Sequence, residues 1–276
     1  MRVALTQLTS SDDPVANLSM TRDMIRDGAG QGAQFVLTPE VTNCLSASRT
    51  RQRAVLTGQD QDATLAGLRD SARDLGIWLL IGSLALTTDD SDGRFANRSF
   101  LISPTGEIVA WYDKIHMFDV QVSETETYRE SSGYRPGARA VVADTPMAQV
   151  GLTVCYDVRF PHLYRQLAQA GAQILTVPSA FSPVTGAAHW HTLLQARAIE
   201  TGCFVLAPAQ CGTHPTTQGR QRKTYGHSLI VSPWGDVLAD GGTAPGVIIA
   251  DLNLDDVQAA RAKIPSMSVD ARYEGP

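Results

Sequence analysis

The chain has 276 residues, of which 43% are hydrophobic and 18% are charged, a balance that excludes a disordered protein and fits a globular one. Its formal net charge of -5 and pI near 5.6 give no basic footprint for nucleic acid or for an anionic membrane surface. We expect one large domain over residues 1–276. We also expect a cytoplasmic location, because the start of the chain lacks the apolar core of a signal peptide and no stretch reaches the length of a membrane span.

Short apolar runs alternate with amphipathic segments along the chain, a pattern that predicts an α/β protein. Helices are expected from Asp13-Pro14 to about residue 27, and over residues 63–75, 161–171 and 187–201. The tail after Asp255 is expected to be first helical and then irregular. Pro104-Thr105-Gly106 and Pro233-Trp234-Gly235 are typical of hairpin turns, so the sheets should be mixed in direction. Residues 118–138 form the longest irregular stretch and are expected to be a functional or disordered loop. The expected strands are residues 3–7, 34–38, 78–86, 99–103, 107–111, 150–155, 173–177, 203–209, 227–231, 237–239 and 247–251.

Four cysteines in a chain of this length are too few for a disulfide framework, and none forms a C-x-x-C pair typical of structural zinc. Each is expected to be a small buried hydrophobe unless its local context indicates otherwise. Cys155 is the exception, because the apolar run Gly151-Leu152-Thr153-Val154 leads into it and Pro161 then opens a helix. This pattern places the thiol at the carboxyl end of a strand, where α/β sheets bind ligands, and near a helix N-terminus, which favours a thiolate. A buried strand cysteine followed by an ordinary turn is the equally weighted alternative.

Two charged residues share this strand-end placement. Glu40 follows the apolar run Phe35-Val36-Leu37, and a carboxylate in an apolar pocket has a pKa raised toward neutrality, as a general base requires. Lys114 lies at the end of Ile108-Val109-Ala110-Trp111-Tyr112-Asp113, where an ammonium group could stabilise a developing oxyanion. A solvated strand-end acid and a surface lysine are the ordinary alternatives. Together with Cys155, the two residues describe a site.

The three segments Thr38-Pro39-Glu40, Tyr112-Asp113-Lys114-Ile115-His116 and Val154-Cys155-Tyr156-Asp157 resemble the nitrilase superfamily, whose catalytic residues are Glu, Lys and Cys in that chain order. The resemblance extends over nearly the whole chain. Within the superfamily the chain resembles the Nit branch, whose members hydrolyse deaminated glutathione and have ω-amidases as close relatives. Further segments that carry this resemblance are Val158-Arg159-Phe160-Pro161, Pro178-Ser179-Ala180-Phe181, Thr185-Gly186-Ala187-Ala188-His189-Trp190 and Gln210-Cys211-Gly212-Thr213-His214.

The resemblance implies a four-layer αββα sandwich with two mixed β-sheets and helices outside, and a homodimer or higher homo-oligomer. It implies a second glutamate near the site, for which Glu130 in Tyr128-Arg129-Glu130 is the matching residue. It implies a small-molecule amide substrate and no metal or organic cofactor. The loop over residues 213–223 is polar and variable in appearance, so substrate choice can depart there from that of the branch.

The resemblance also implies roles. Cys155 is the nucleophile, Glu40 the general base, and Lys114 with the backbone N–H of Tyr156 stabilises the oxyanion. Arg159 is expected either to clamp a substrate carboxylate or to form a salt bridge with Asp157 or a surface acid. The remaining expected substrate-binding residues are Ser179, Phe181, Thr185 and His189.

The expected activity is hydrolysis of a C–N amide bond in a small carboxylate-bearing substrate, foremost deaminated glutathione, through a thioester. An ω-amidase acting on α-ketoglutaramate is the nearest alternative, followed by another amidase, carbamoylase or nitrile hydrolase of the same family. A small-molecule binding protein without activity is the alternative from a different class, and the intact set of Glu40, Lys114 and Cys155 argues against it.

Overall fold

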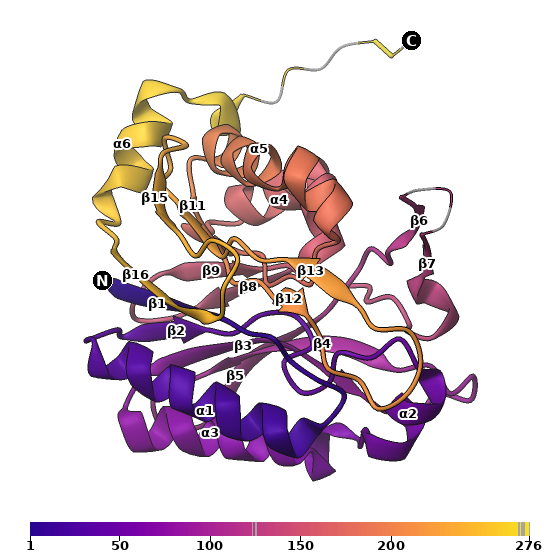
Figure 1. Cartoon of the computed structure of the whole chain (residues 1–276). Coiled ribbons are helices and arrows are strands. Elements are labelled where there is room, and N and C mark those ends of the chain that lie inside the picture. Colours follow the sequence, from indigo (N-terminus) through magenta and orange to yellow (C-terminus); the bar gives the residue numbers. More distant parts are fainter. Residues whose placement is uncertain (123, 125, 270, 272–273, 276) are drawn as a thin grey trace.

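Two six-stranded sheets face each other in the computed structural model, which describes residues 1–122, 124, 126–269, 271 and 274–275 (Figure 1). The first sheet has the order β16-β1-β2-β3-β4-β5, with β1 Arg2–Gln7, β2 Phe35–Leu37, β3 Trp78–Leu86, β4 Ala96–Ile102, β5 Ile108–Asp113 and β16 Gly246–Asp251. The second has the order β15-β14-β11-β10-β9-β8, with β8 Val141–Asp144, β9 Gln149–Leu152, β10 Ile174–Thr176, β11 Phe204–Ala207, β14 Leu229–Val231 and β15 Val237–Asp240.

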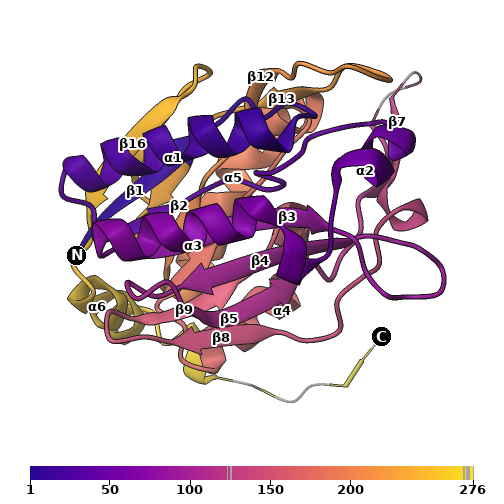
Figure 2. The same cartoon turned by 90° about the horizontal axis from the view of Figure 1, so that it is seen from below.

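Helices cover the outer face of each sheet. α1 (Pro14–Gly30) and α3 (Ala63–Leu75) lie side by side on the first sheet, as Figure 2 shows from below. α4 (Pro161–Gln169) and α5 (Pro183–Thr201) cover the second sheet, and α6 (Asp255–Lys263) follows β16. Both sheets contain parallel and antiparallel pairs. The predicted αββα sandwich with mixed sheets is therefore confirmed.

Side-chain alternation along the strands explains the four layers. Leu80 on β3 packs in the core cluster that reaches both sheets, whereas its neighbour Leu79 packs against α1 and α3. Val3 and Ala4 on β1 divide in the same way. Because successive side chains of a strand point to opposite faces, a strand buried on both faces has a continuous apolar run. This is why the strands are readable in the sequence.

The first and last strands of the sandwich pair with each other. β1 runs antiparallel to β16 from the Arg2–Asp251 pair to the Gln7–Gly246 pair, and Arg2 and Asp251 also form a salt bridge of 2.8 Å. Among the described residues, no helix is both long and apolar enough to cross a membrane.

Helix ends follow their capping residues, with one correction. Asp13 accepts hydrogen bonds from the backbone of the first turn of α1, and α3 ends at Gly76 with φ of 64°. The helix expected to begin at residue 187 instead begins at Pro183, because proline at the first helical position needs no N–H donor and has the right φ.

Several short elements lie outside the predicted set. The stretch 118–138 contains the hairpin of β6 (Asp119–Gln121) and β7 (Thr127–Arg129), followed by the 3-10 turn η2 (Glu130–Ser132). A second hairpin, β12 (Cys211–Thr213) with β13 (Lys223–Tyr225), flanks the 213–223 loop. The remaining unpredicted elements are β8, α2 (Arg49–Val55) and the 3-10 turns η1 (Gln59–Gln61), η3 (Cys155–Arg159) and η4 (Ser266–Ser268).

Candidate active site

Glu40, Lys114 and Cys155 come together from the two sheets. Glu40 follows β2 and Lys114 follows β5, two strands of the first sheet that point in the same direction. Cys155 follows β9 of the second sheet. All three are buried, with exposed fractions of 5%, 2% and 7%, and all three line the same cavity. The convergence predicted from the three strand ends is therefore present in the fold.

The Lys114 ammonium group joins two carboxylates. Its Nζ donates to Glu40 Oε1 at 2.9 Å and to Glu130 Oε1 and Oε2 at 3.0 and 2.8 Å. Glu130 Oε2 also accepts from the backbone N–H of Phe118 at 2.6 Å, which fixes the η2 turn against the site. The ammonium group therefore lies between the two carboxylates and forms an ion pair with each.

The Glu40 carboxylate is held on both oxygens. Oε1 accepts from Asn97 Nδ2 at 2.9 Å in addition to Lys114, and Oε2 accepts from the backbone N–H of Ala180 at 2.8 Å. Gln210 Nε2 donates to the Glu40 carbonyl oxygen at 3.0 Å. With side chain and backbone both fixed, the carboxylate has one orientation toward Cys155.

The electrostatics of the site correct two expectations. Burial acts to raise the pKa of Glu40, but the charge and hydrogen bond of Lys114, with hydrogen bonds from Cys155 and Asn97, hold this pKa below its ordinary value. Burial and the Glu40 charge raise the pKa of Cys155, and the opposing effect of Lys114 is smaller. The pKa of Lys114 is raised well above its ordinary value, since the charges of Glu130, Glu40 and Cys155 outweigh burial. The resting state is thus a carboxylate, an ammonium group and a neutral thiol, not a neutral acid and a thiolate.

Cys155 lies on a strained turn. The expected strand 150–155 ends at Leu152, and Cys155 begins η3 with φ of 51°, a left-handed conformation that is unusual for any residue but glycine. Its N–H donates to Pro178 O at 3.0 Å. Asp157 braces the turn, because its carboxylate accepts from Val154 N at 2.9 Å and from the Tyr112 hydroxyl at 2.7 Å.

Asp157 also connects the cysteine turn to the lysine segment. Its Oδ1 accepts from the backbone N–H of His116 at 3.0 Å and lies 2.7 Å from His116 Nδ1. The motifs around Lys114 and Cys155 therefore form one hydrogen-bonded unit across the two sheets. Tyr112 and His116 of the lysine segment thus share Asp157 of the cysteine segment as a hydrogen-bond partner.

The cavity has a volume of about 710 Å³. Of the other residues predicted for the site, Glu130, Tyr156, Phe181 and Thr185 line it. Ser179 is fully buried behind the cavity wall, where its hydroxyl donates to Val177 O. The first backbone N–H groups of a 3-10 turn have no hydrogen-bond acceptor within that turn. Tyr156 is the second residue of η3, so its N–H is available to donate to a substrate oxygen.

Arg159 and His189 lie beside the cavity and contact each other. The Arg159 guanidinium is 3.3 Å from His189 Nδ1 and 5.5 Å from the ring centroid of Phe181, a cavity residue. It forms no pair with Asp157, whose oxygens bind the groups described above. The carboxylate clamp by Arg159 stays a prediction.

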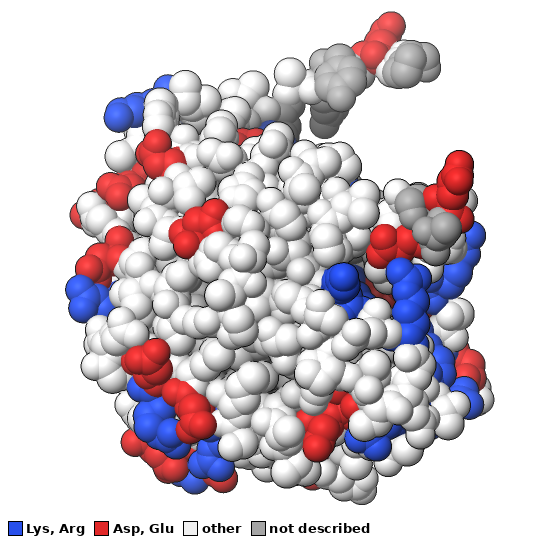
Figure 3. Space-filling view, viewed as in Figure 1, with Lys and Arg blue, Asp and Glu red and all other residues white. Residues whose placement is uncertain are grey.

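Two features of the site escaped the sequence reasoning. Asn97 bridges Glu40 and Glu130, donating to both at 2.9 and 3.3 Å. It lies in β4 between Ala96 and Arg98, so no apolar run marks it in the sequence, and asparagine disfavours strands. The other feature is the cationic part of the cavity wall, formed by Arg49, Arg129, Arg220, Arg222 and Lys223. Figure 3 shows basic side chains gathered near the β6–β7 hairpin, on a molecule whose net charge is negative.

Comparison with known proteins places the chain in the family that its sequence motifs resemble. Residues 2–262 match the family model of the carbon-nitrogen hydrolases. The chain is 39% identical to a deaminated glutathione amidase of Yersinia enterocolitica, over 95% of this chain and 90% of that protein. The structure superposes on Saccharomyces cerevisiae Nit3, a member of branch 10 of the nitrilase superfamily, with a TM-score of 0.84, 27% identity, and coverage of 96% and 94%.

A mutant of an amidase of Nesterenkonia sp. AN1 superposes with a TM-score of 0.77 and 30% identity, over 98% of this chain and all of that chain. In the structure of that mutant, acrylamide has added to the active-site cysteine. The family match spans nearly all of the sequence, and the solved structures named above share the fold. The chain belongs to the carbon-nitrogen hydrolases of the nitrilase superfamily.

Proposed function

We propose that this chain hydrolyses the amide bond of deaminated glutathione with Cys155 as nucleophile, Glu40 as general base and Lys114 as oxyanion donor. The observation that carries the proposal is the buried grouping of these three residues in one cavity. The substrate is suggested by the relatives that carry the name deaminated glutathione amidase, at 38–39% identity over at least 95% of this chain.

The first half of the reaction forms a thioester. Because the resting thiol is neutral and Glu40 is ionised, the thiol proton moves to Glu40 as sulfur attacks the carbonyl carbon. The carbonyl electrons move to oxygen, where the Lys114 ammonium and the Tyr156 N–H donate hydrogen bonds. The C–N bond then breaks, and protonated Glu40 gives its proton to the leaving nitrogen.

The second half releases the acid. Water enters after the amine leaves, and Glu40, again a carboxylate, takes a proton from it as the oxygen attacks the thioester. The second tetrahedral intermediate collapses with loss of the thiolate, which regains its proton from Glu40. Glu130 and Asn97 do not exchange protons in this scheme; they position Lys114 and Glu40 through the hydrogen bonds described above.

The cavity wall suits a substrate with more than one carboxylate. Arg222, Ser182 and Thr185 line it, and Arg222 Nε, Ser182 Oγ and Thr185 Oγ1 are buried without a hydrogen-bond partner among the described residues. Buried polar atoms left unpaired are costly, so a bound acceptor would stabilise this wall. A substrate carboxylate supplies such an acceptor, and a volume of about 710 Å³ is large enough for a molecule of tripeptide size.

The test is to offer deaminated glutathione and α-ketoglutaramate separately and to measure the release of α-ketoglutarate. We expect deaminated glutathione to have the higher kcat/KM of the two substrates. The Cys155→Ala substitution should lower kcat by a factor of about 10⁴ or more. A preference for α-ketoglutaramate would make the chain an ω-amidase. Activity of Cys155→Ala within about tenfold of the wild type would contradict the mechanism itself.

Arg222 is the residue whose substitution should separate the two substrates. Deaminated glutathione has a second carboxylate far from the scissile amide, whereas α-ketoglutaramate lacks it. Arg222→Gln should therefore raise the KM for deaminated glutathione about tenfold or more and change that for α-ketoglutaramate less than about twofold. Arg53→Gln, at an exposed position on α2, is the matched control. Equal effects of Arg222→Gln on both substrates would contradict this assignment.

A homodimer is part of the same proposal. The apolar side chains of Val184 and Ile199 on α5 are 53% and 58% exposed, and the face over α5 in Figure 3 carries few charged side chains. Apolar surface of this kind supports contact with a second copy of the chain. Light scattering after size exclusion should give a molar mass twice that of the chain. The Ile199→Glu variant should give the mass of a single chain.

A further inference from the structure

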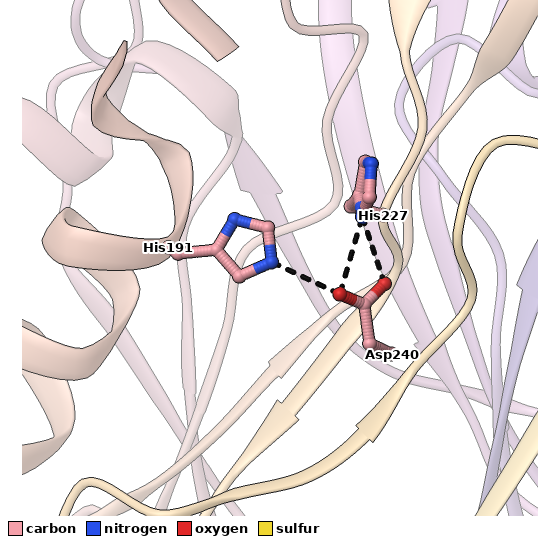
Figure 4. Close-up of side chains that lie close together, drawn as sticks. All are labelled: His191, His227 and Asp240. Carbon is pink, nitrogen blue, oxygen red and sulfur yellow. Dashed lines mark hydrogen bonds and ion pairs between the residues drawn. The ribbon is translucent and has the colours of Figure 1, made fainter. Parts of the chain in front are cut away.

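Three side chains of the kinds that can bind a metal ion, from separate elements, meet on the side of the second sheet that α5 covers. His191 lies on α5, His227 lies in the turn between β13 and β14, and Asp240 ends β15 (Figure 4). Asp240 Oδ2 is 3.0 Å from His191 Nε2, and its Oδ1 and Oδ2 are 2.9 and 3.1 Å from His227 Nδ1. None of the three lines the cavity of Cys155.

From this arrangement we infer that His191, His227 and Asp240 bind one zinc ion. Two imidazoles and one carboxylate are a ligand set that zinc prefers, with bonds of about 2.0–2.2 Å and one coordination position left for water. Ligand atoms around a tetrahedral ion at that distance are about 3.3 Å apart. The three donor atoms lie within 4.8 Å of one another, so small side-chain shifts suffice to bind the ion.

The ligands are held in place by their surroundings. The His227 backbone has φ of 55°, a conformation that costs free energy outside glycine, and its carbonyl oxygen accepts from Trp190 Nε1 at 2.8 Å. Its ring stacks on Tyr225, with centroids 4.5 Å apart. Asp240 Oδ1 accepts from the backbone N–H of Gly242 at 2.8 Å. Supports of this kind orient metal ligands before the ion binds.

Gln7 fixes the two chain segments that carry His227 and Asp240. Its Nε2 donates to the carbonyl oxygens of Gly241, Gly242 and Ala244 at 2.8–3.1 Å, and its Oε1 accepts from Ser228 N at 2.7 Å. The side chains of His191, His227 and Asp240 are 33%, 23% and 33% exposed, so an ion can enter from solvent. Within the described residues, the ion-pair partners of Asp240 are these two histidines.

The bound zinc would act as a cross-link. It would join α5 to the β13–β14 turn and to β15, three elements that are otherwise held by packing and hydrogen bonds. The first residues of α5, Pro183 to Thr185, line the active-site cavity. Zinc at this position therefore stabilises the fold and one wall of the cavity, and takes no part in the amide chemistry.

The test is calorimetric titration of tag-free, chelator-treated protein with zinc chloride. We expect one zinc ion per chain, and a Tm higher by about 5 °C when free zinc is a hundred times the Kd. Magnesium, which imidazole binds poorly, should change neither quantity. Absence of heat with zinc, together with an unchanged Tm, would overturn the inference.

Variants locate the ion. His191→Gln and Asp240→Asn should each weaken zinc binding at least tenfold, whereas His162→Gln, at an exposed position on α4, should not. Circular dichroism and the Tm in chelator show whether each variant folds, and two ligand variants keep the test valid if one does not.

The Cys155 thiol is a competing zinc ligand, so Cys155→Ala is titrated as well and should bind zinc as the wild type does. Cobalt substitution should give visible bands without a thiolate charge-transfer band. If zinc binding were lost in Cys155→Ala and kept in His191→Gln, the ion would belong to the active site. That result would refute the zinc site at His191, His227 and Asp240.

Discussion

Lys114 is the charge on which the site depends, because one ammonium group with 2% exposure forms ion pairs with two carboxylates, Glu40 and Glu130. A buried carboxylate without such a partner would bind a proton and could not act as a base. The ion pair therefore reverses the effect of burial on Glu40 and keeps it ionised at neutral pH. The cysteine needs that base, because its own pKa is raised and it cannot ionise alone.

The pH profile should reflect this charge balance. The pKa of Glu40 in the fold lies below its ordinary value of 4.5, so the acid limb of kcat/KM should fall below pH 4.5. The ion pair of Glu40 with Lys114 contributes to the free energy of unfolding at pH values above 4.5. This contribution is lost as the pH falls through the pKa that Glu40 has in the folded protein. Rates measured from pH 4 to 9, corrected for unfolding, check this; an acid limb near pH 6 would contradict it.

Asn97 should act by positioning. Asn97→Ala removes one of the hydrogen bonds that hold the Glu40 carboxylate and lower its pKa, so we expect kcat to fall about tenfold to a hundredfold with little change in KM. The acid limb should also move to higher pH, which a general loss of stability would not cause. An unchanged kcat and pH profile would show that Lys114 and Ala180 suffice to orient Glu40.

At the scale of elements, α5 is packed so closely that its glycine is required. A Cβ at Gly186 would lie 2.3 Å from the Tyr225 ring on β13, whereas one at Gly30, the last residue of α1, would meet nothing within 4 Å. Alanine favours a helix by about 1 kcal/mol, and overpacking costs about 1–3 kcal/mol. The clash should therefore exceed the helical gain at Gly186.

Urea denaturation of the two alanine variants checks this comparison. Gly186→Ala should lower the free energy of unfolding by up to about 2 kcal/mol, and Gly30→Ala should raise it by a few tenths to about 1 kcal/mol. The Gly186 variant should also weaken substrate binding, because the start of α5 lines the cavity. A Gly186→Ala protein as stable as the wild type would mean that Tyr225 moves freely.

Elements with a strong local signal could be predicted from the sequence, and those defined by partners could not. The helix Ala63–Leu75 has its expected bounds because Asp62 and Gly76 cap it. By contrast, β8 pairs at a sheet edge through half-exposed residues, and β6, β7 and η2 form against the site. The Glu40 pKa escaped prediction because it depends on Lys114, 74 residues away in the chain.

The whole molecule matters to the site because Glu40 and Lys114 come from one sheet and Cys155 from the other. Their alignment depends on how the sheets pack, and hence on side chains with no contact to substrate. The dependence of the site on sheet packing can be tested at Leu79 and Leu80. These neighbours on β3 are both fully buried, and their side chains lie on opposite faces of the sheet.

Replacing either leucine by alanine should cost about 2–5 kcal/mol of unfolding free energy. Only Leu80→Ala, in the core cluster that includes both sheets, should also lower kcat, by about fivefold or more at a temperature where both variants are folded. Leu79→Ala should stay within about twofold of the wild type. Equal kcat values in the two variants would mean that the sheets keep their alignment without full packing.

The pairing of β1 with β16 also bears on how the protein is made. During synthesis β1 has an open edge until its partner residues 246–251 have also emerged from the ribosome. Nascent chains therefore present an unpaired apolar strand while the residues between β1 and β16 are synthesised, a period in which such an edge can recruit other chains. Chaperone capture of β1, held until β16 has emerged, would protect the first sheet until it closes.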